Sequence, residues 1–282
     1  MRCYICGATS KDFNNLLIKK PVDPNAIKFG LSILHARIRF FESLLHLSYK
    51  LPIQKWQVRT EADKNIVKET KREIQDKFRK EMGLLVDMPK QGYGNSNDGN
   101  TSRRFFKKPE ISARITGVDI RLIRRFKVIL EVISSGHKIN VEKFGIYTMD
   151  TAKLYVQLYS WYPMTPTVHK VLIHGPLVIQ DALVPIGQLS EEAMEARNKY
   201  VRNYRLNHAR KFSREGCNMD VLKRLLVTSD PLISSLRKNI KKKSEPYTKE
   251  VTEMFLPISE AEEEEEEEDT DEETDEESFI DS

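Results

Sequence analysis

Two short stretches far apart in the chain decide the expected fold: Cys3-Tyr4-Ile5-Cys6 and His169-Lys170-Val171-Leu172-Ile173-His174. The cysteines have the two-residue gap of a thiolate pair, and the histidines have the four-residue gap of a histidine pair. Together they form a Cys2His2 set, which predicts a closed, tetrahedral zinc site with a structural rather than a catalytic role. The same residues also fit a chance cysteine pair with unrelated histidines, and spacing alone leaves both interpretations open.

The histidine spacing places a demand on the backbone. On a regular α-helix, two residues five positions apart point about 140° away from each other. Both can therefore reach one metal ion only if the helix ends or distorts there. Gly175-Pro176 follows directly, and this dipeptide predicts that the helix stops at that point.

The hydrophobic pattern predicts a mainly α fold. Apolar residues recur at three- and four-residue steps, and no alternating run is long enough to predict a strand. The expected helices cover residues 27–51, 60–83, 118–134, 141–161, 166–184, 190–214, 220–227 and 231–238. A loop is expected at 89–100, and a linker at 239–259 precedes an acidic tail that should stay unpacked. This organisation gives three segments: a helical zinc-binding domain at 1–185, a C-terminal helical segment at 186–238, and the linker and disordered tail at 239–282.

Charge is divided unevenly along the chain. The protein has 46 basic and 42 acidic residues, and residues 260–282 hold 16 of the acidic ones and no Lys or Arg. Residues 1–259 therefore carry a formal charge of +20, which predicts a polyanionic partner, most simply nucleic acid. No apolar run is long enough to cross a membrane, the N-terminus has no signal-peptide pattern, and three cysteines do not favour a disulfide framework. We expect a reducing compartment.

Two basic stretches are candidates for DNA contact. In the first, the loop 97–100 leads to the cations Arg103, Arg104, Lys107 and Lys108. A glycine-containing loop with paired cations is able to cradle a phosphate backbone. A mobile surface loop with a solvated basic run explains the same sequence.

The second stretch is the expected helix from Ser190, which we take as its N-cap. Its first turns hold Glu191, Glu192 and Glu195, and its continuation is basic, with Arg197, Lys199, Arg202, Arg205 and Arg210 as candidate DNA contacts. A carboxylate beside many cations suits a divalent metal next to phosphates. A helix with acids first and bases last, as the dipole favours, is the competing interpretation. Cys217 is expected to be a free thiol.

The order of these motifs resembles the C-terminal half of the Transib-type transposases and the related catalytic subunit of the V(D)J recombinase. The resemblance rests on the cysteine pair, the histidine pair, the stretch Ser-Glu-Glu-Ala-Met-Glu-Ala-Arg-Asn-Lys at 190–199 and the segment 97–106. It covers roughly residues 1–240 and leaves the acidic tail outside.

The resemblance implies an RNase H-like recombinase in which two aspartates and a glutamate bind Mg²⁺ or Mn²⁺ and cut and join DNA. By motif position the glutamate is Glu195, with Glu191 and Glu192 as neighbouring competitors. The zinc ligands are Cys3, Cys6, His169 and His174. The fold expected is a zinc-stapled helical domain followed by the final catalytic-type helix.

In that family both aspartates precede the cysteine pair, whereas this chain begins two residues before it. We therefore expect the chain alone to be inactive in DNA cleavage and strand transfer. A nuclear location, homodimers, and histones or other basic proteins as partners of the tail are further expectations. The alternative, which needs no family, is a non-enzymatic nuclear DNA- or histone-interacting protein regulated by its acidic tail.

Overall fold

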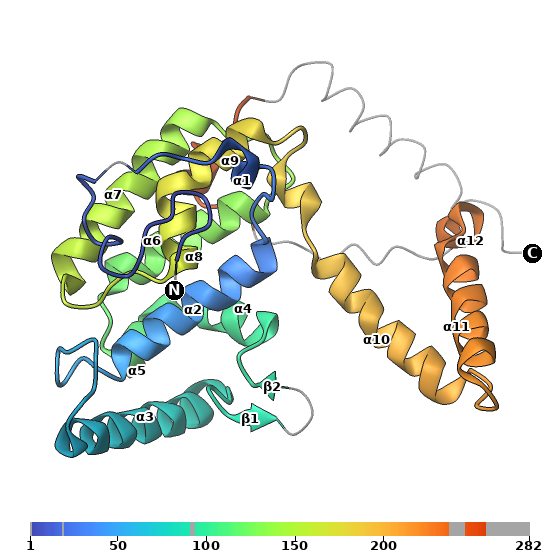
Figure 1. The fold of residues 1–282 in the computed structure, drawn as a ribbon, viewed down its shortest axis with the longest axis horizontal. Helices are drawn as coiled ribbons and strands as arrows, with labels where there is room; N and C mark the ends of the chain where they lie inside the picture. The colour runs from blue at the N-terminus through green and yellow to red at the C-terminus, as the bar shows by residue number, and fades with distance from the viewer. Residues whose placement is uncertain (1, 19, 91–93, 237–245, 258–282) are drawn as a thin grey trace, which may run out of the picture.

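The computed structural model describes residues 2–18, 20–90, 94–236 and 246–257, and it is mainly α-helical (Figure 1). The only strands in these ranges, β1 (Pro89–Lys90) and β2 (Gly94–Asn95), form a small antiparallel hairpin. The other elements, in chain order, are α1 (Pro24–Ile27), α2 (Ile33–Ser48), α3 (Glu61–Met82), α4 (Gly99–Lys107), α5 (Pro109–Thr116), α6 (Ile120–Ser134), α7 (Val141–Tyr159), α8 (Pro166–His169), the π-helical turn η1 (Lys170–His174), α9 (Gly175–Asp181), the 3-10 turn η2 (Ile186–Leu189), α10 (Glu192–Asn207), α11 (Arg214–Ser229), α12 (Pro231–Ser235) and α13 (Lys249–Thr252). No described helix is both long and apolar enough to span a bilayer.

Helix α2 is the centre of the core. Its N-cap is Ser32, and it contacts α4, α5, α6 and α8. Phe40 and Phe41 are fully buried, with Phe40 packed on Phe126 of α6 at a ring distance of 4.5 Å and Phe41 on Phe105 of α4 at 5.0 Å. Burial of large aromatic side chains on both sides of α2 joins the layers into one body.

Helix α3 confirms the predicted amphipathic helix. It begins after the N-cap Thr60 and ends at Gly83, whose left-handed φ of 59° is the usual conformation of a glycine C-cap. Ile74, Phe78 and Met82 form its buried stripe, while its remaining faces are mostly charged and exposed. Most of this helix is therefore held by one narrow apolar face.

Two regions of the body differ from the sequence expectation. Residues 99–116 form the helices α4 and α5, although no helix was expected between 89 and 117. Residues 246–257, part of the expected linker, pack back on the body: Val251 is fully buried, and Phe255 forms a β-bridge with Ile139. The rest of the linker and the tail lie outside the described residues.

Helices α10, α11 and α12 form an arm that projects from the body (Figure 1). The single helix expected over 190–214 is wrong, because α10 ends at Asn207 and the chain turns before α11 begins at Arg214. Ser190 is also not the N-cap: α10 begins at Glu192, and Ser190 closes the preceding 3-10 turn.

Candidate metal centre

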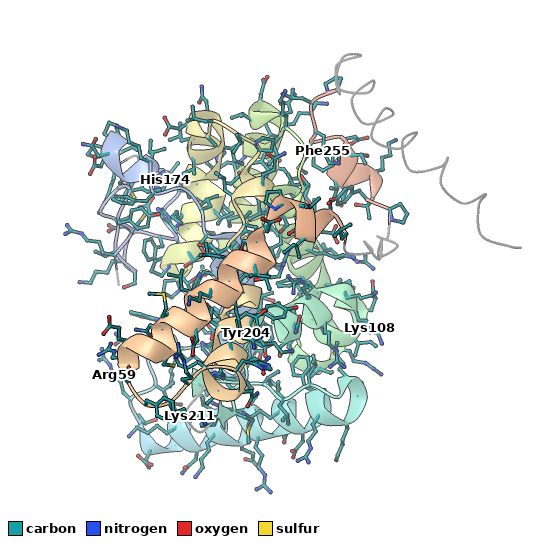
Figure 2. The ribbon with its side chains drawn as sticks, turned by 90° about the vertical axis from the view of Figure 1, so that its right-hand side faces the viewer. Arg59, Lys108, His174, Tyr204, Lys211 and Phe255 are labelled. Atoms are coloured by element: carbon teal, nitrogen blue, oxygen red, sulfur yellow. The ribbon has the colours of Figure 1, made fainter. Side chains whose placement is uncertain are left out.

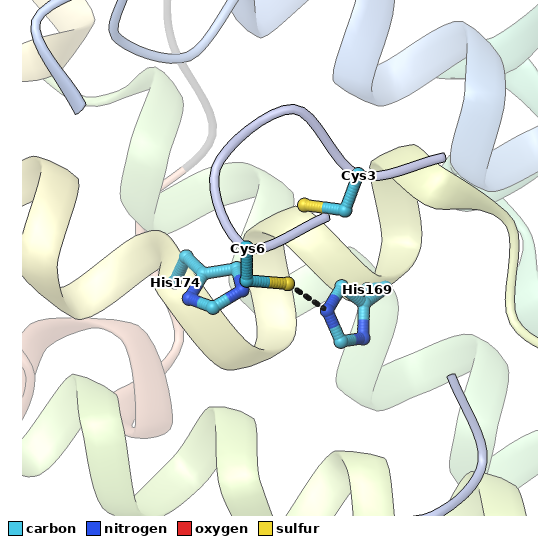
Figure 3. Close-up of side chains that lie close together, drawn as sticks. All are labelled: Cys3, Cys6, His169 and His174. Atoms are coloured by element: carbon cyan, nitrogen blue, oxygen red, sulfur yellow. Dashed lines mark hydrogen bonds between the residues drawn. The ribbon is translucent and has the colours of Figure 1, made fainter. Parts of the chain in front are cut away.

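The cysteine pair lies on a tight N-terminal loop. The Gly7 amide donates to the Cys3 carbonyl and the Cys3 amide donates to the Ala8 carbonyl, each at 2.8 Å. Gly7 has a φ of 67°, in the left-handed region that glycine tolerates best. This turn brings the side chains of Cys3 and Cys6 to the same side of the loop (Figure 3).

The histidine pair lies on a distorted helix, as its spacing requires. Residues 170–174 form the π-helical turn η1 between α8 and α9. A π-turn closes hydrogen bonds between residues five apart, so His169 and His174 come to lie on one side of the helix. The expected stop at Gly175-Pro176 is wrong, since α9 continues to Asp181. Pro176 explains the distortion, because it has no N–H to donate and its ring crowds the carbonyl of the preceding turn.

The two pairs meet. One donor atom from each of Cys3, Cys6, His169 and His174 lies within 4.8 Å of the others (Figure 3). The Cys6 Sγ and His169 Nε2 atoms are 3.5 Å apart. Zinc bond lengths in a tetrahedral site place sulfur and nitrogen ligands about 3.5 Å from each other, so this pair already has the spacing of a coordinated pair.

Burial and hydrogen bonding also fit a metal. Cys3 is 2% exposed, His169 7% and His174 5%, and the His174 Nε2 atom is buried without a hydrogen-bond partner. An orphaned polar atom in a core is costly unless a ligand satisfies it. Phe13 packs against His169 in a tilted arrangement, at a ring distance of 4.7 Å, and limits the movement of that ligand.

The protonation of the four side chains suits a metal site. Burial, with a further contribution from neighbouring His174, lowers the pKa of His169 to about 4. Burial also lowers the pKa of His174. Both imidazoles are thus neutral near pH 7 and able to bind a metal. Burial, reinforced by Cys3, raises the pKa of the Cys6 thiol, so metal binding must release its proton.

The expected phosphate loop has a different local role. Asp98 is the N-cap of α4, and Gly99 passes so close to α2 that a Cβ there would lie 2.8 Å from the Leu34 side chain. Asn97 is buried and donates to the Asp87 carboxylate at 2.8 Å. Asp98 therefore caps α4, and Gly99 allows the start of α4 to pass close to α2. These two local roles explain why the sequence is turn-like here.

Asp87 holds this region together. Its side chain, 7% exposed, also contacts His46 Nε2 at 3.2 Å and Lys71 Nζ at 3.1 Å. Burial alone would raise the pKa of Asp87, but the hydrogen bonds and charges of these two partners outweigh it and hold the pKa well below its usual range.

The predicted cations of α4 divide into two kinds. Arg104 donates to the carbonyls of Met82 and Gly83 and so caps the end of α3. Arg103 and Lys107 line a cleft of about 190 Å³ together with Arg37 and Lys127. Lys108 is exposed just beyond α4.

Sequence reasoning missed Arg37 and Lys127, because they lie on the separate helices α2 and α6. Glu131 also lines the cleft and pairs with Lys127 at 3.7 Å. No local sequence signal could have joined these side chains, since only the packing of three helices brings them together.

The predicted cations of the arm are partly used within it. Arg197 donates to Thr228 and Ser229 of α11, both at 3.1 Å, and Arg205 donates to Asn218 at 3.0 Å.

Arg210 forms a two-point salt bridge with Asp220. Lys199 and Arg202 are exposed on α10. Figure 2 shows Lys211 at the tip of the arm, well separated from Lys108 on the body. The predicted DNA contacts thus form two groups.

The predicted catalytic glutamate lies in the first turns of α10. The backbone of Glu195 is helical, and its side chain lies outside the described residues, as does that of Glu192. Glu191 accepts a hydrogen bond from the Ser32 hydroxyl at 2.6 Å, which connects the base of the arm to the cap of α2. That bond gives Glu191 a structural role.

Neither a scan against protein-family models nor a search of curated proteins produced a match for this chain. What the geometry establishes is a mainly α-helical protein with a Cys2His2 cluster able to hold a metal ion such as zinc.

Proposed function

We propose that this chain is the zinc-stapled, DNA-contacting part of a DNA-cutting and strand-transfer recombinase of the Transib type. In this role the zinc ion fixes the helical body, and the body and the arm present cations to the DNA backbone. The chain would act in the nucleus, where its substrate lies.

The convergence of the two ligand pairs supports this proposal most strongly. The motif order that resembles these transposases names Cys3, Cys6, His169 and His174 as ligands of one ion. Their donor atoms lie within 4.8 Å of one another although Cys6 and His169 are 163 residues apart in sequence. Four chemically suitable residues rarely gather in a buried site without a ligand to satisfy them.

The cleft beside α4 supports the DNA contact. Four cations, Arg37, Arg103, Lys107 and Lys127, line a cleft of about 190 Å³ against one carboxylate, Glu131. Guanidinium and ammonium groups gathered in one cleft suit phosphate oxygens, and contacts to phosphates fix a protein on DNA without reading its sequence.

Glu195 is the proposed catalytic residue, by motif position alone. A bound Mg²⁺ or Mn²⁺ pair would activate the attacking oxygen and stabilise the leaving oxygen. Glu195 would supply one carboxylate to that pair, and the family places the two aspartates upstream of the cysteine pair.

A binding experiment tests the DNA contact. The affinity for duplex DNA is measured by fluorescence anisotropy over a range of salt concentrations for the wild type and for Lys199→Gln/Arg202→Gln. We expect a steep salt dependence and weaker binding by the variant, because each lost phosphate contact lowers the salt slope by about 0.9. Lys68→Gln, an exposed cation on the mixed-charge helix α3, is the matched control.

Salt-independent affinity, or equal loss in the control, would contradict the proposed contact. A nicking assay with Mg²⁺ and Mn²⁺ on the same preparations tests the catalytic part. Robust cleavage abolished by Glu195→Gln would show that this chain supplies a complete metal site.

A further inference from the structure

Helix α11 is apolar on two opposite faces. The face that packs against α10 consists of residues at four-residue steps: Cys217, Val221 and Leu225. Val221 at its centre is only 6% exposed. Met219 and Leu222 lie on the other face, about 200° and 100° around the helix from Val221.

This outer stripe consists of Met219, Leu222 and Leu226, which are 45%, 49% and 62% exposed. A shallow hollow of about 460 Å³ lies over its N-terminal half, lined by Arg214, Glu215, Asn218, Met219 and Leu222. A helix that is apolar on both sides is normally buried on both sides. The outer stripe therefore calls for an occupant with apolar side chains, which a DNA backbone does not offer.

Charge restricts what that occupant is. Between residues 197 and 229 the arm carries nine Lys or Arg and two acidic residues. Two such arms from different copies would repel each other, which disfavours a second copy as the occupant. The partner that fits has apolar residues within an acidic segment.

The chain contains one such segment. Residues 260–282 hold 16 acidic side chains, and near their end Phe279-Ile280 stands between Glu276-Glu277 and Asp281. Apart from Ala261, these two are the only apolar residues of the segment. Twenty-five residues follow Pro257, the last described residue, and they can span about 80 Å. Leu236, at the end of the arm, and Pro246, on the next described segment, are ten residues apart in sequence and so at most about 36 Å apart in space. The segment is therefore long enough to reach the arm.

We propose that residues 260–282 dock on the outer face of α11, with Phe279 and Ile280 on the stripe of Met219, Leu222 and Leu226. The flanking carboxylates pair with Arg214 and Lys223 at its edges. Docking covers the apolar stripe and neutralises the cations of the arm. If the arm contacts DNA, as the proposed function requires, the docked segment competes with DNA for it.

The test uses the intact chain without DNA. A carbodiimide joins carboxylates to lysines in direct contact, and mass spectrometry of the monomer locates the joined pairs. We expect the tail carboxylates to join Lys199, Lys211 and Lys223 of the arm in preference to Lys107 and Lys108 of the body.

Two variants and a control make the location specific. Leu222→Ser/Leu226→Ser and Phe279→Ser/Ile280→Ser should each reduce the arm crosslinks tenfold or more, because each variant removes two large apolar side chains and burial of even one is worth roughly tenfold in affinity. All four substitutions are outside the described core, so the helix content should not change. Leu183→Ser, which removes a fully exposed leucine outside the arm, should leave the crosslinks unaltered.

Crosslinks spread evenly over the lysines of the body, or arm crosslinks that survive both variants, would overturn the docking. Arm crosslinks found only in a dimer fraction would also overturn it, because the occupant would then belong to a second copy. The experiment contains no DNA, and so its failure is separate from that of the proposed function: docking can hold in a chain that binds no DNA, and DNA binding can hold in a chain whose tail does not dock.

Discussion

Removal of the metal should destabilise the body strongly. A zinc ion that joins Cys6 to His169 closes a loop of 163 residues, because these two ligands are that far apart in sequence. In the chain-entropy description of a crosslink, a loop of this length restricts the unfolded chain by about 5 kcal/mol. Domains have total stabilities of about 5–15 kcal/mol, so this contribution is a large fraction of the whole.

Thermal unfolding followed by circular dichroism measures the effect. For a body of this size each kcal/mol shifts Tm by about 2–4 °C, so chelation by EDTA should lower Tm by about 10–20 °C. His174→Ala should lower Tm in the same direction and reduce the further effect of the chelator, because a ligand is already missing. Added zinc should restore the wild type and not the variant.

Cys217→Ser is the matched control. Cys217 lies on the arm, outside the ligand set, so the variant should respond to EDTA as the wild type does. A wild type whose Tm is unchanged by EDTA, and unchanged by loss of His174, would refute the reasoning, since the four residues would then be packed without a metal.

Three further results are expected. Arg103→Ala/Lys107→Ala should weaken DNA binding and reduce the slope of log affinity against log salt by about 1.8, because two phosphate contacts are lost. The control Lys68→Gln should change neither quantity. Anisotropy titrations measure both variants, and an unchanged slope in the double variant would show that the α4 cleft does not contact DNA. The pKa of Asp87 is lower in the folded than in the unfolded chain, so its contribution to stability is present above the unfolded value near 4 and is lost as pH falls through the folded value. Asp87→Asn should therefore cost about 2 kcal/mol in urea unfolding at pH 7 and less at pH 3, and an equal loss at both pH values would contradict the charge-based role. Glu195→Gln should leave both Tm and DNA binding unchanged if the side chain serves only metal-dependent chemistry, and a clear loss of Tm would give it a structural role instead.

The long amphipathic helices could be predicted from the sequence. The pattern over 60–83, 118–134 and 141–161 corresponds to α3, α6 and α7 within two residues at each end. These helices have one persistent apolar face, and such a face fixes both their period and their extent.

The short helices could not be predicted in the same way. Helix α4 starts with Asp98-Gly99, which is typical of a turn, and the need for glycine there arises from the approach of Leu34 on a distant helix. Residues 248–256 are too short to show a helical period, and only the buried positions of Val251 and Met254 show that they belong to the body. Tertiary packing decides both cases.

The candidate site was predictable in its residues and not in its backbone. Cys3, Cys6, His169 and His174 could be named from spacing and motif order. The π-turn that places His169 and His174 on one side of the helix could not be predicted. It depends on Pro176, which lies within a helix that continues beyond it. The cations Arg37 and Lys127 of the α4 cleft had no sequence signal.

The most direct test of the central claim is the metal content and ligand set of the purified chain. Elemental analysis should find one zinc ion per chain, and zinc X-ray absorption should show two sulfur ligands at about 2.3 Å and two nitrogen ligands at about 2.0 Å. A folded chain that binds no zinc, or zinc held by oxygen ligands, would contradict the account.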